Sequence, residues 1–106
     1  MENIIAFDEL AFESEGDFKW YLSRGCEIEF IWKGKYYSIT HPDGLILISE
    51  GYYIKDGVAY NALSHEKYDI SNQLESNDIN EILNYMIDGD RLGDIVTKIG
   101  IVDRTL

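Results

Sequence analysis

The sequence predicts an α+β fold in which helices pack on one side of a small antiparallel β-meander sheet, giving two layers. Two features indicate this fold. Runs of β-branched and aromatic residues at 27–32 and 36–40 flank a glycine turn, and apolar residues between 79 and 99 recur at helical spacing. A chain of 106 residues with 45% hydrophobic residues is typical of one globular domain, here residues 1–106.

The first elements are predicted to be helical. Spacings of three to five residues between the apolar side chains of residues 4–12 suit a short helix. A clearer helix begins after Ser14, a favourable N-cap, and ends at Arg24-Gly25. Its apolar stripe is formed by Phe18, Tyr21 and Leu22.

The hairpin of residues 27–40 is the best specified element. A two-residue type II′ turn at Gly34-Lys35 pairs Lys33 with Tyr36. This register collects the apolar side chains on one face of the hairpin. The expected cross-strand pairs on that face are Trp32 with Tyr37, Phe30 with Ile39, and Ile28 with His41.

More strand signals follow. The sequence His41-Pro42-Asp43-Gly44 has the chemistry of a type I turn, and the apolar run 45–48 predicts a third strand, central or covered on both faces, that Ser49-Glu50-Gly51 ends. Asp56-Gly57 is a type I′ signal that predicts a second hairpin over residues 52–63, with Tyr53 opposite Tyr60. Residues 64–76 lack a strong period and are expected to be irregular.

Two helices and an edge strand are predicted to close the chain. The first helix covers residues 79–87, with Ser76 or Asn77 as its N-cap and Gly89 as its stop. Asp90 is expected to cap a second helix, which ends at Gly100. The apolar face of that second helix consists of Leu92, Ile95, Val96 and Ile99, and Ile101-Val102 is expected to add an edge strand.

Charge is the most unusual property of the chain. Twenty acidic residues against nine basic ones give a net charge of −11, which disfavours direct binding to nucleic acid or to anionic membranes. Residues 1–17 and 68–90 each hold six acids and no base. Two interpretations remain open: a surface that only promotes solubility, or an acidic face that complements a basic partner.

Cysteine content and hydropathy indicate the cellular location. Cys26 is the only cysteine, so an intramolecular disulfide is not possible. The N-terminus lacks the pattern of a signal peptide, and the longest apolar run, residues 45–48, is too short to span a membrane. A cytoplasmic location is therefore expected.

Catalytic and metal-binding signals are weak. His41 and His65 lack the spacing of a metal site, and Cys26 has no base close by in the sequence. Residues 88–94 begin like a calcium loop, but Leu92 and Ile99 occupy the fifth and twelfth positions of that loop, where oxygen ligands are needed. The match of residues 64–67 to S-x-x-K lacks companion motifs. Glu27 and Glu29 share a strand face but need a deep cleft to act on a sugar. No cofactor is expected.

The hairpin motif resembles a known group. Residues 25–39 match the pattern G-x-E-I-E-F-x-[YW]-x-G-K-x-Y-x-I, and residues 87–95 match I-D-G-x-x-L-x-D-I. Both resemble a group of small, functionally uncharacterised proteins of Gram-positive bacteria and their phages. The resemblance implies a bacterial or phage origin and a shared scaffold, without an activity or functional residues. Residues 49–73 lie outside it, where individual function could lie.

These features favour a non-enzymatic protein-binding module. Its concrete form would be a phage or mobile-element inhibitor that occupies a basic nucleic-acid-binding site of a host protein. Eight tyrosines exceed what one small core needs, and tyrosine is enriched at interfaces. The alternatives are a small hydrolase or nucleotide-handling enzyme with His41 or His65 as acid–base, and a homodimer formed by the last strand or a hairpin edge. The candidate partner-binding residues are Glu75, Asp78, Glu81, Asp88, Tyr52, Tyr60 and Tyr85. Exposure, at least in part, is expected for Tyr36, for Tyr52 or Tyr53, and for Tyr60, Tyr68 and Tyr85.

Overall fold

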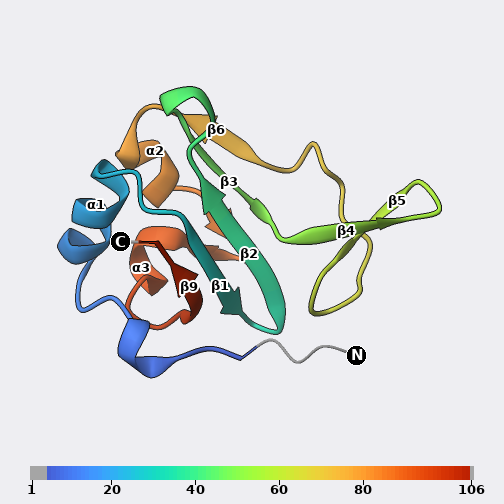
Figure 1. Ribbon diagram of the computed structural model, residues 1–106, viewed down its shortest axis with the longest axis horizontal. Coiled ribbons are helices and arrows are strands. Elements are labelled where there is room, and N and C mark those ends of the chain that lie inside the picture. Colours follow the sequence, from blue (N-terminus) through green and yellow to red (C-terminus); the bar gives the residue numbers. More distant parts are fainter. Residues whose placement is uncertain (1–4, 106) are drawn as a thin grey trace.

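The computed structural model describes residues 5–105 and has a five-stranded antiparallel sheet with its helices on one side (Figure 1). The strand order is β6-β3-β2-β1-β9, and two small hairpins, β4-β5 and β7-β8, complete the strands. This architecture confirms the predicted α+β class. The main-sheet strands are β1 Ile28–Trp32, β2 Lys35–Thr40, β3 Ile46–Glu50, β6 Leu74–Ser76 and β9 Gly100–Arg104; the hairpins are β4 Tyr52–Lys55 with β5 Val58–Asn61 and β7 Met86–Ile87 with β8 Asp90–Arg91.

The helices are short. They are α1 Glu15–Ser23, α2 Ile79–Leu83 and α3 Leu92–Ile95, with 3-10 turns η1 Asp8–Leu10 and η2 Pro42–Gly44. Helix α1 starts as predicted, because the Ser14 hydroxyl accepts the Asp17 N–H at 3.0 Å. The helix expected over residues 4–12 is reduced to η1, and its first residue lies outside the described part of the chain. Within residues 5–105 none of the helices has the length and hydrophobicity needed to cross a bilayer.

The core lies between the helices and one face of the sheet. Alternate residues of the central strands point into it, as expected for a sheet covered on one side. Members that are fully or almost fully buried include Phe18 and Leu22 of α1, Ile28 and Phe30 of β1, Ile39, Ile48, Ile82, Leu83, Leu92 and Ile101. The opposite face of the sheet carries Glu29, Tyr36, Ser38, Thr40 and Asp103.

The first hairpin differs from its predicted register. Lys33 and Gly34 both have positive φ, 48° and 76°, so the turn is of type I′ and lies at Lys33-Gly34 instead of Gly34-Lys35. The observed pairs are Trp32 with Lys35, Phe30 with Tyr37, and Ile28 with Ile39. The predicted register was wrong by two residues. Because side chains alternate with a period of two, that shift leaves the same residues on the buried face.

The middle of the chain follows the prediction with three differences. The second hairpin is confirmed, with Asp56-Gly57 in its turn and Tyr53 opposite Tyr60. β3 is a central strand as expected, but it continues through Glu50. The turn before it is not of type I, because Asp43 has a φ of 52°. The end of the segment expected to be irregular pairs with β3 as β6.

The C-terminal part contains the largest correction. α2 ends at Leu83, and the residues beyond it form the β7-β8 hairpin, because Asp88 and Gly89 adopt φ values of 49° and 87° and make another tight turn. The Asp78 carboxylate, instead of Ser76 or Asn77, caps α2. Asp90 lies in β8 and does not cap α3. β9 confirms the predicted edge strand.

Candidate functional site

The β4-β5 hairpin, called the arm here, projects away from the sheet and helices (Figure 1). All four residues of β4 are exposed, and three of them in a row are large and apolar. Their exposed fractions are 43% for Tyr52, 38% for Tyr53 and 58% for Ile54. An arm with apolar side chains on both faces is a feature of binding surfaces, because water solvates these groups poorly.

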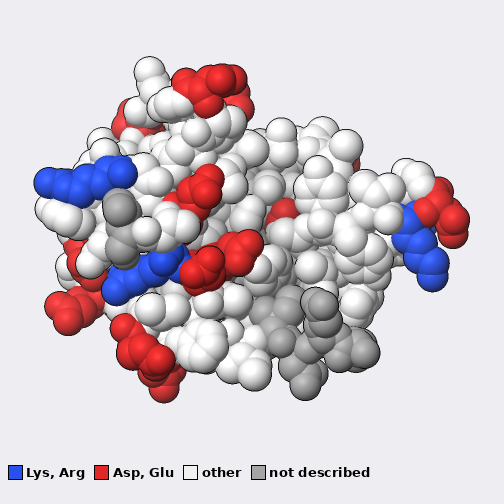
Figure 2. Space-filling model, in the orientation of Figure 1, with Lys and Arg blue, Asp and Glu red and all other residues white. Residues whose placement is uncertain are grey.

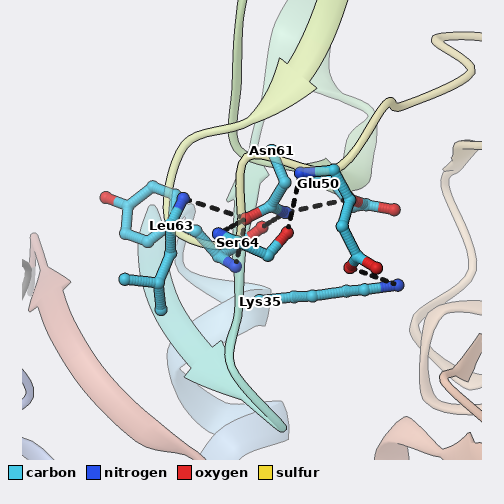
Figure 3. Close-up of polar contacts among 7 residues, drawn as sticks. Lys35, Glu50, Asn61, Leu63 and Ser64 are labelled. Atoms are coloured by element: carbon cyan, nitrogen blue, oxygen red, sulfur yellow. Dashed lines mark hydrogen bonds and ion pairs between the residues drawn. The ribbon is translucent and has the colours of Figure 1, made fainter.

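A single buried asparagine fixes the base of the arm (Figure 3). Asn61 is fully buried at the end of β5. Its Oδ1 accepts the N–H of Tyr36 at 3.0 Å, and its Nδ2 donates to the Tyr36 carbonyl at 3.0 Å and to the Glu50 carboxylate at 2.8 Å. The same Oδ1 also accepts from the N–H groups of Leu63 and Ser64. The Gly51 N–H also donates to the Tyr36 carbonyl, at 2.8 Å. The Asn61 side chain therefore adds to the main-chain pairing at this end of β2 and holds the turn after β5.

Two further contacts hold the arm against the body. The Tyr36 ring lies over Gly51, at a distance that leaves no room for a Cβ on that residue. Lys35 Nζ lies 3.7 Å from the Glu66 carboxylate. Contacts of this kind hold the arm in place, and a binding element that is held in place loses less entropy when it binds a partner.

The outer edge of β5 is covered by the chain that follows it. The Asn61 N–H donates to the Glu66 carbonyl at 2.8 Å, and the Tyr68 N–H donates to the Ala59 carbonyl at 2.9 Å. Tyr60 also forms an isolated antiparallel bridge with Lys67. β5 is thus paired on both sides, and β4 is the exposed strand of the arm.

A chain of tyrosine contacts connects the arm to the body. The Tyr52 ring lies 5.4 Å from the Tyr68 ring, and the hydroxyls of Tyr68 and Tyr85 donate to the Asn72 carbonyl at 2.7 and 3.2 Å. The expectation that Tyr68 is exposed was wrong, because it is 6% exposed beneath Tyr52. Burial raises the pKa of Tyr68 to about 12, and burial with the nearby Glu50 carboxylate also raises the pKa of Tyr85.

The predicted partner-binding residues are only partly gathered. Tyr52 is exposed on the arm, Tyr60 is half-buried and stacks on Tyr53, and Tyr85 is linked to the arm through Asn72. The acids lie on other elements, with Glu75 on β6, Asp78 and Glu81 at α2, and Asp88 in the β7-β8 turn. All four acids are exposed.

Some of these acids also have local structural roles. Asp78 caps α2 by accepting the Asn80 N–H at 2.9 Å, and Glu81 accepts the Ser76 hydroxyl at 2.7 Å. In Figure 2, acidic side chains are spread over the visible face, while basic ones occupy a few places. On this face the acids are therefore not gathered in one patch.

Sequence reasoning omitted two residues of this site, Ile54 and Asn61, and gave Tyr53 only as an alternative to Tyr52 for exposure. The run Tyr52-Tyr53-Ile54 lacks the apolar–polar alternation of a strand with one covered face. In a hairpin that no second layer covers, such a run must be exposed, so the absence of alternation could have indicated the exposed arm. A lone asparagine at the end of a strand gives no comparable indication.

Among the described residues neither histidine contacts a carboxylate. His41 Nε2 lies 2.8 Å from the Cys26 carbonyl. His41 lines a cleft of about 410 Å³ between α1, η2 and α2 whose lining residues include no carboxylate in the described part of the protein. His65 is exposed, and its Nδ1 lies 2.8 Å from the Tyr53 hydroxyl. Cys26 is completely buried.

The other candidate residues lie at separate places in the fold. Glu27 and Glu29 line a pocket of about 130 Å³ with Asp103, on the open face of the sheet. This volume is below that of typical ligand sites. The calcium-like segment 88–94 forms a turn, β8 and the start of α3, and across residues 5–105 there is no group of three or more His, Cys, Asp or Glu side chains arranged to hold a metal ion.

Comparison with protein-family models, with curated proteins and with solved structures yields no match to this chain.

Proposed function

We propose that this protein is a non-enzymatic protein-binding module that uses the arm as its anchor. One observation carries the proposal: Tyr52, Tyr53 and Ile54 are exposed in a row on a hairpin whose base is held by the buried Asn61. A few residues, among which tyrosine, tryptophan and arginine are enriched, supply most of the binding energy at protein interfaces. A fixed arm offers them at a low entropic cost.

The proposed partner has a basic surface, and its class is a nucleic-acid-binding protein of a bacterial host. The support is the net charge of −11. Acidic residues outnumber basic ones by twenty to nine, and the resulting negative field speeds encounter with a cationic surface. In this scheme the arm provides the anchor and the acids provide attraction and orientation.

The arrangement offers less to an acid–base enzyme. The cleft beside His41 has no carboxylate among its described lining residues, and the His65 ring faces a tyrosine on the exposed arm. General acid–base catalysis needs a group held close to the reacting atom, in a site that can position substrate. We therefore propose binding, and not hydrolysis, as the function.

The test is affinity capture from a nuclease-treated Gram-positive lysate, quantified by mass spectrometry at low and high salt. The arm variant carries Tyr53→Ser with Ile54→Ser. The charge variant carries Glu75→Gln, Asp78→Asn, Glu81→Gln and Asp88→Asn, which removes four negative charges and keeps each local hydrogen-bond acceptor. A matched control is Trp20→Gln, which removes a 49% exposed aromatic from α1.

The expected result is a protein that wild type and the Trp20 control retain at low salt. It should be lost from the arm variant, and reduced by high salt and in the charge variant, because screening weakens exposed charge pairs. Equal retention by wild type and the arm variant would refute the arm as anchor. Retention that neither salt nor the charge variant changes would refute the role of the acids.

A further inference from the structure

The backbone of β4 has a free edge. Asn61 and Ala59 direct their main-chain N–H and C=O groups toward residues 66–68. Successive residues of a strand direct these groups to opposite sides of the strand. Val58 and Tyr60 therefore bond to their partners Lys55 and Tyr53 in β4. Tyr52 and Ile54 direct their N–H and C=O groups away from β5, and the hydrogen bonds found across residues 5–105 include no partner for them.

We infer that this edge receives an extended segment of the partner protein as an added strand, an inference that rests on the proposed protein-binding function. Two N–H and two C=O groups, from Tyr52 and Ile54, are available for such pairing. Proteins usually protect an exposed edge with proline, a bulge or a charged side chain. β4 has no proline or bulge, and its only charged residue, Lys55, is at its end. Addition of a strand to an open edge is an established mode of peptide recognition.

The other sheet edges are less suited to this role. β9 is covered in part, because the Phe7 N–H donates to the Ile101 carbonyl at 2.8 Å and η1 packs beside it. β6 is only three residues long. β4 thus combines a free edge with apolar side chains beside it.

The chemistry of the added segment follows from what lies opposite it. A residue that pairs with Tyr52 or Ile54 lies on the same face as that side chain, so apolar residues fit these positions. Side chains of an added strand point alternately to the two faces of the arm, so the residues between these positions lie on the face that carries Tyr53. A positively charged segment is favoured because the protein has a net charge of −11.

A second copy of this chain fits the edge less well. Antiparallel pairing of two β4 edges about Tyr53 places Ile54 of one copy opposite Tyr52 of the other, which is favourable. In the same register the charged residue of β4, Lys55, lies opposite Gly51 of the second copy, so the pairing gains no contact between opposite charges. Two chains of charge −11 also repel each other. The charges therefore favour a basic partner segment over a dimer.

The first test uses a synthetic peptide in which valine and threonine alternate between terminal lysine pairs. One analogue is N-methylated at every valine and the other at every threonine. Valines should face Tyr52 and Ile54 and donate their N–H groups to β4, so methylation there should weaken binding roughly tenfold or more, through lost hydrogen bonds and steric blocking. Methylation at threonine should have little effect.

Amide hydrogen exchange of the protein shows where the peptide binds. With the unmodified peptide, the amides of Tyr52 and Ile54 should become protected, while that of Tyr53 is already paired with Tyr60. Equal weakening by both methylation patterns, or no binding at millimolar peptide, would overturn strand addition of a basic segment. A dimer of the free protein with these same two amides protected would overturn it in favour of a second copy.

A pair of variants tests the same edge against the captured partner. Ile54→Pro removes the edge N–H at a position where an edge strand tolerates proline. Ile54→Thr keeps the N–H and the β-branched shape but loses apolar surface. Strand addition predicts a much larger loss for the proline variant. Equal losses would mean that only side chains bind the partner, which overturns this inference and leaves the proposed function standing. Unchanged capture by both of these variants and by the arm variant would refute the proposed function itself.

Discussion

The side-chain amide of Asn61 pairs with both main-chain groups of Tyr36, at 3.0 Å each, in the way that a neighbouring strand would. The contact joins the arm to β2 across 25 positions of sequence. Because Asn61 is completely buried, its loss leaves donors and acceptors that water reaches poorly.

Asn61→Ala should therefore lower the free energy of unfolding by about 2–4 kcal/mol. It should also increase hydrogen exchange throughout the arm. Urea denaturation and amide exchange measure the two effects. Asn80→Ala is the matched control, because Asn80 is exposed on α2. A change in stability no greater than that of the control would show that the amide does not hold the arm.

The contact between Gly51 and Tyr36 gives a second prediction. A Cβ on residue 51 would overlap the Tyr36 ring. Gly51→Ala should cost about 1–3 kcal/mol of stability, as overpacked sites do. The cost should shrink in a chain that also carries Tyr36→Ala, because the ring is then absent. Gly16→Ala is the control, since its new Cβ would lie 3.7 Å from the nearest atom, the Ser14 Oγ. An equal cost of Gly51→Ala with and without the ring would contradict this explanation.

The turns show how far the sequence could predict the fold. Asp56-Gly57 was placed correctly, because aspartate and glycine tolerate the two positive φ values of a type I′ turn. At Lys33-Gly34 a lysine takes one of these positions, and Gly34-Lys35 satisfies a type II′ turn equally well by residue type. Local chemistry could not separate the two registers, since both bury the same side chains.

The β7-β8 hairpin was missed for a different reason. Ile79, Ile82, Leu83, Met86 and Ile87 have the spacing of one helix, so periodicity extended α2 too far. In the fold, Met86 is 58% exposed and Ile87 is buried, because Asp88-Gly89 turns the chain back. The candidate site was harder still, because the exposure of Ile54 depends on the absence of a covering layer and the role of Asn61 depends on residues distant in sequence.

Asp90 ties the tip of the first hairpin to β8 and gives a prediction for acid pH. Its carboxylate accepts the Trp32 indole N–H at 3.0 Å and lies 2.8 Å from Lys33 Nζ. The hydrogen bond from Lys33, and next that from Trp32, lower the pKa of Asp90. A lowered pKa stabilises the fold above the ordinary aspartate pKa of about 3.9, and this contribution is lost as pH falls through the lower folded value.

The pKa of Asp90 can be measured by carboxyl NMR. It should lie below the ordinary aspartate value in the wild type and should rise in Lys33→Ala. Lys35→Ala is the matched control, because Lys35 pairs with Glu66 and not with Asp90. A pKa of Asp90 that is the same in wild type and in both variants would rule out the Lys33 contact as its cause.

The buried tyrosines predict a loss of stability at alkaline pH. Burial raises the pKa of Tyr68 from its ordinary value of 10 to about 12 and raises the pKa values of Tyr36 and Tyr37 as well. Between these pH values the unfolded chain releases protons that the folded chain retains. The stabilisation is therefore complete below pH 10 and is lost as pH rises toward the folded values.

Tyr68→Phe separates this effect from packing. At pH 7 the variant should lose about 1 kcal/mol, because the hydroxyl no longer donates to the Asn72 carbonyl. Between pH 9 and about 11 its stability should fall less steeply than that of the wild type, because one suppressed ionisation is gone. Urea midpoints across this range, followed together with tyrosinate absorbance, measure both changes. Parallel pH slopes for the two proteins would show that the Tyr68 hydroxyl does not titrate as its burial requires.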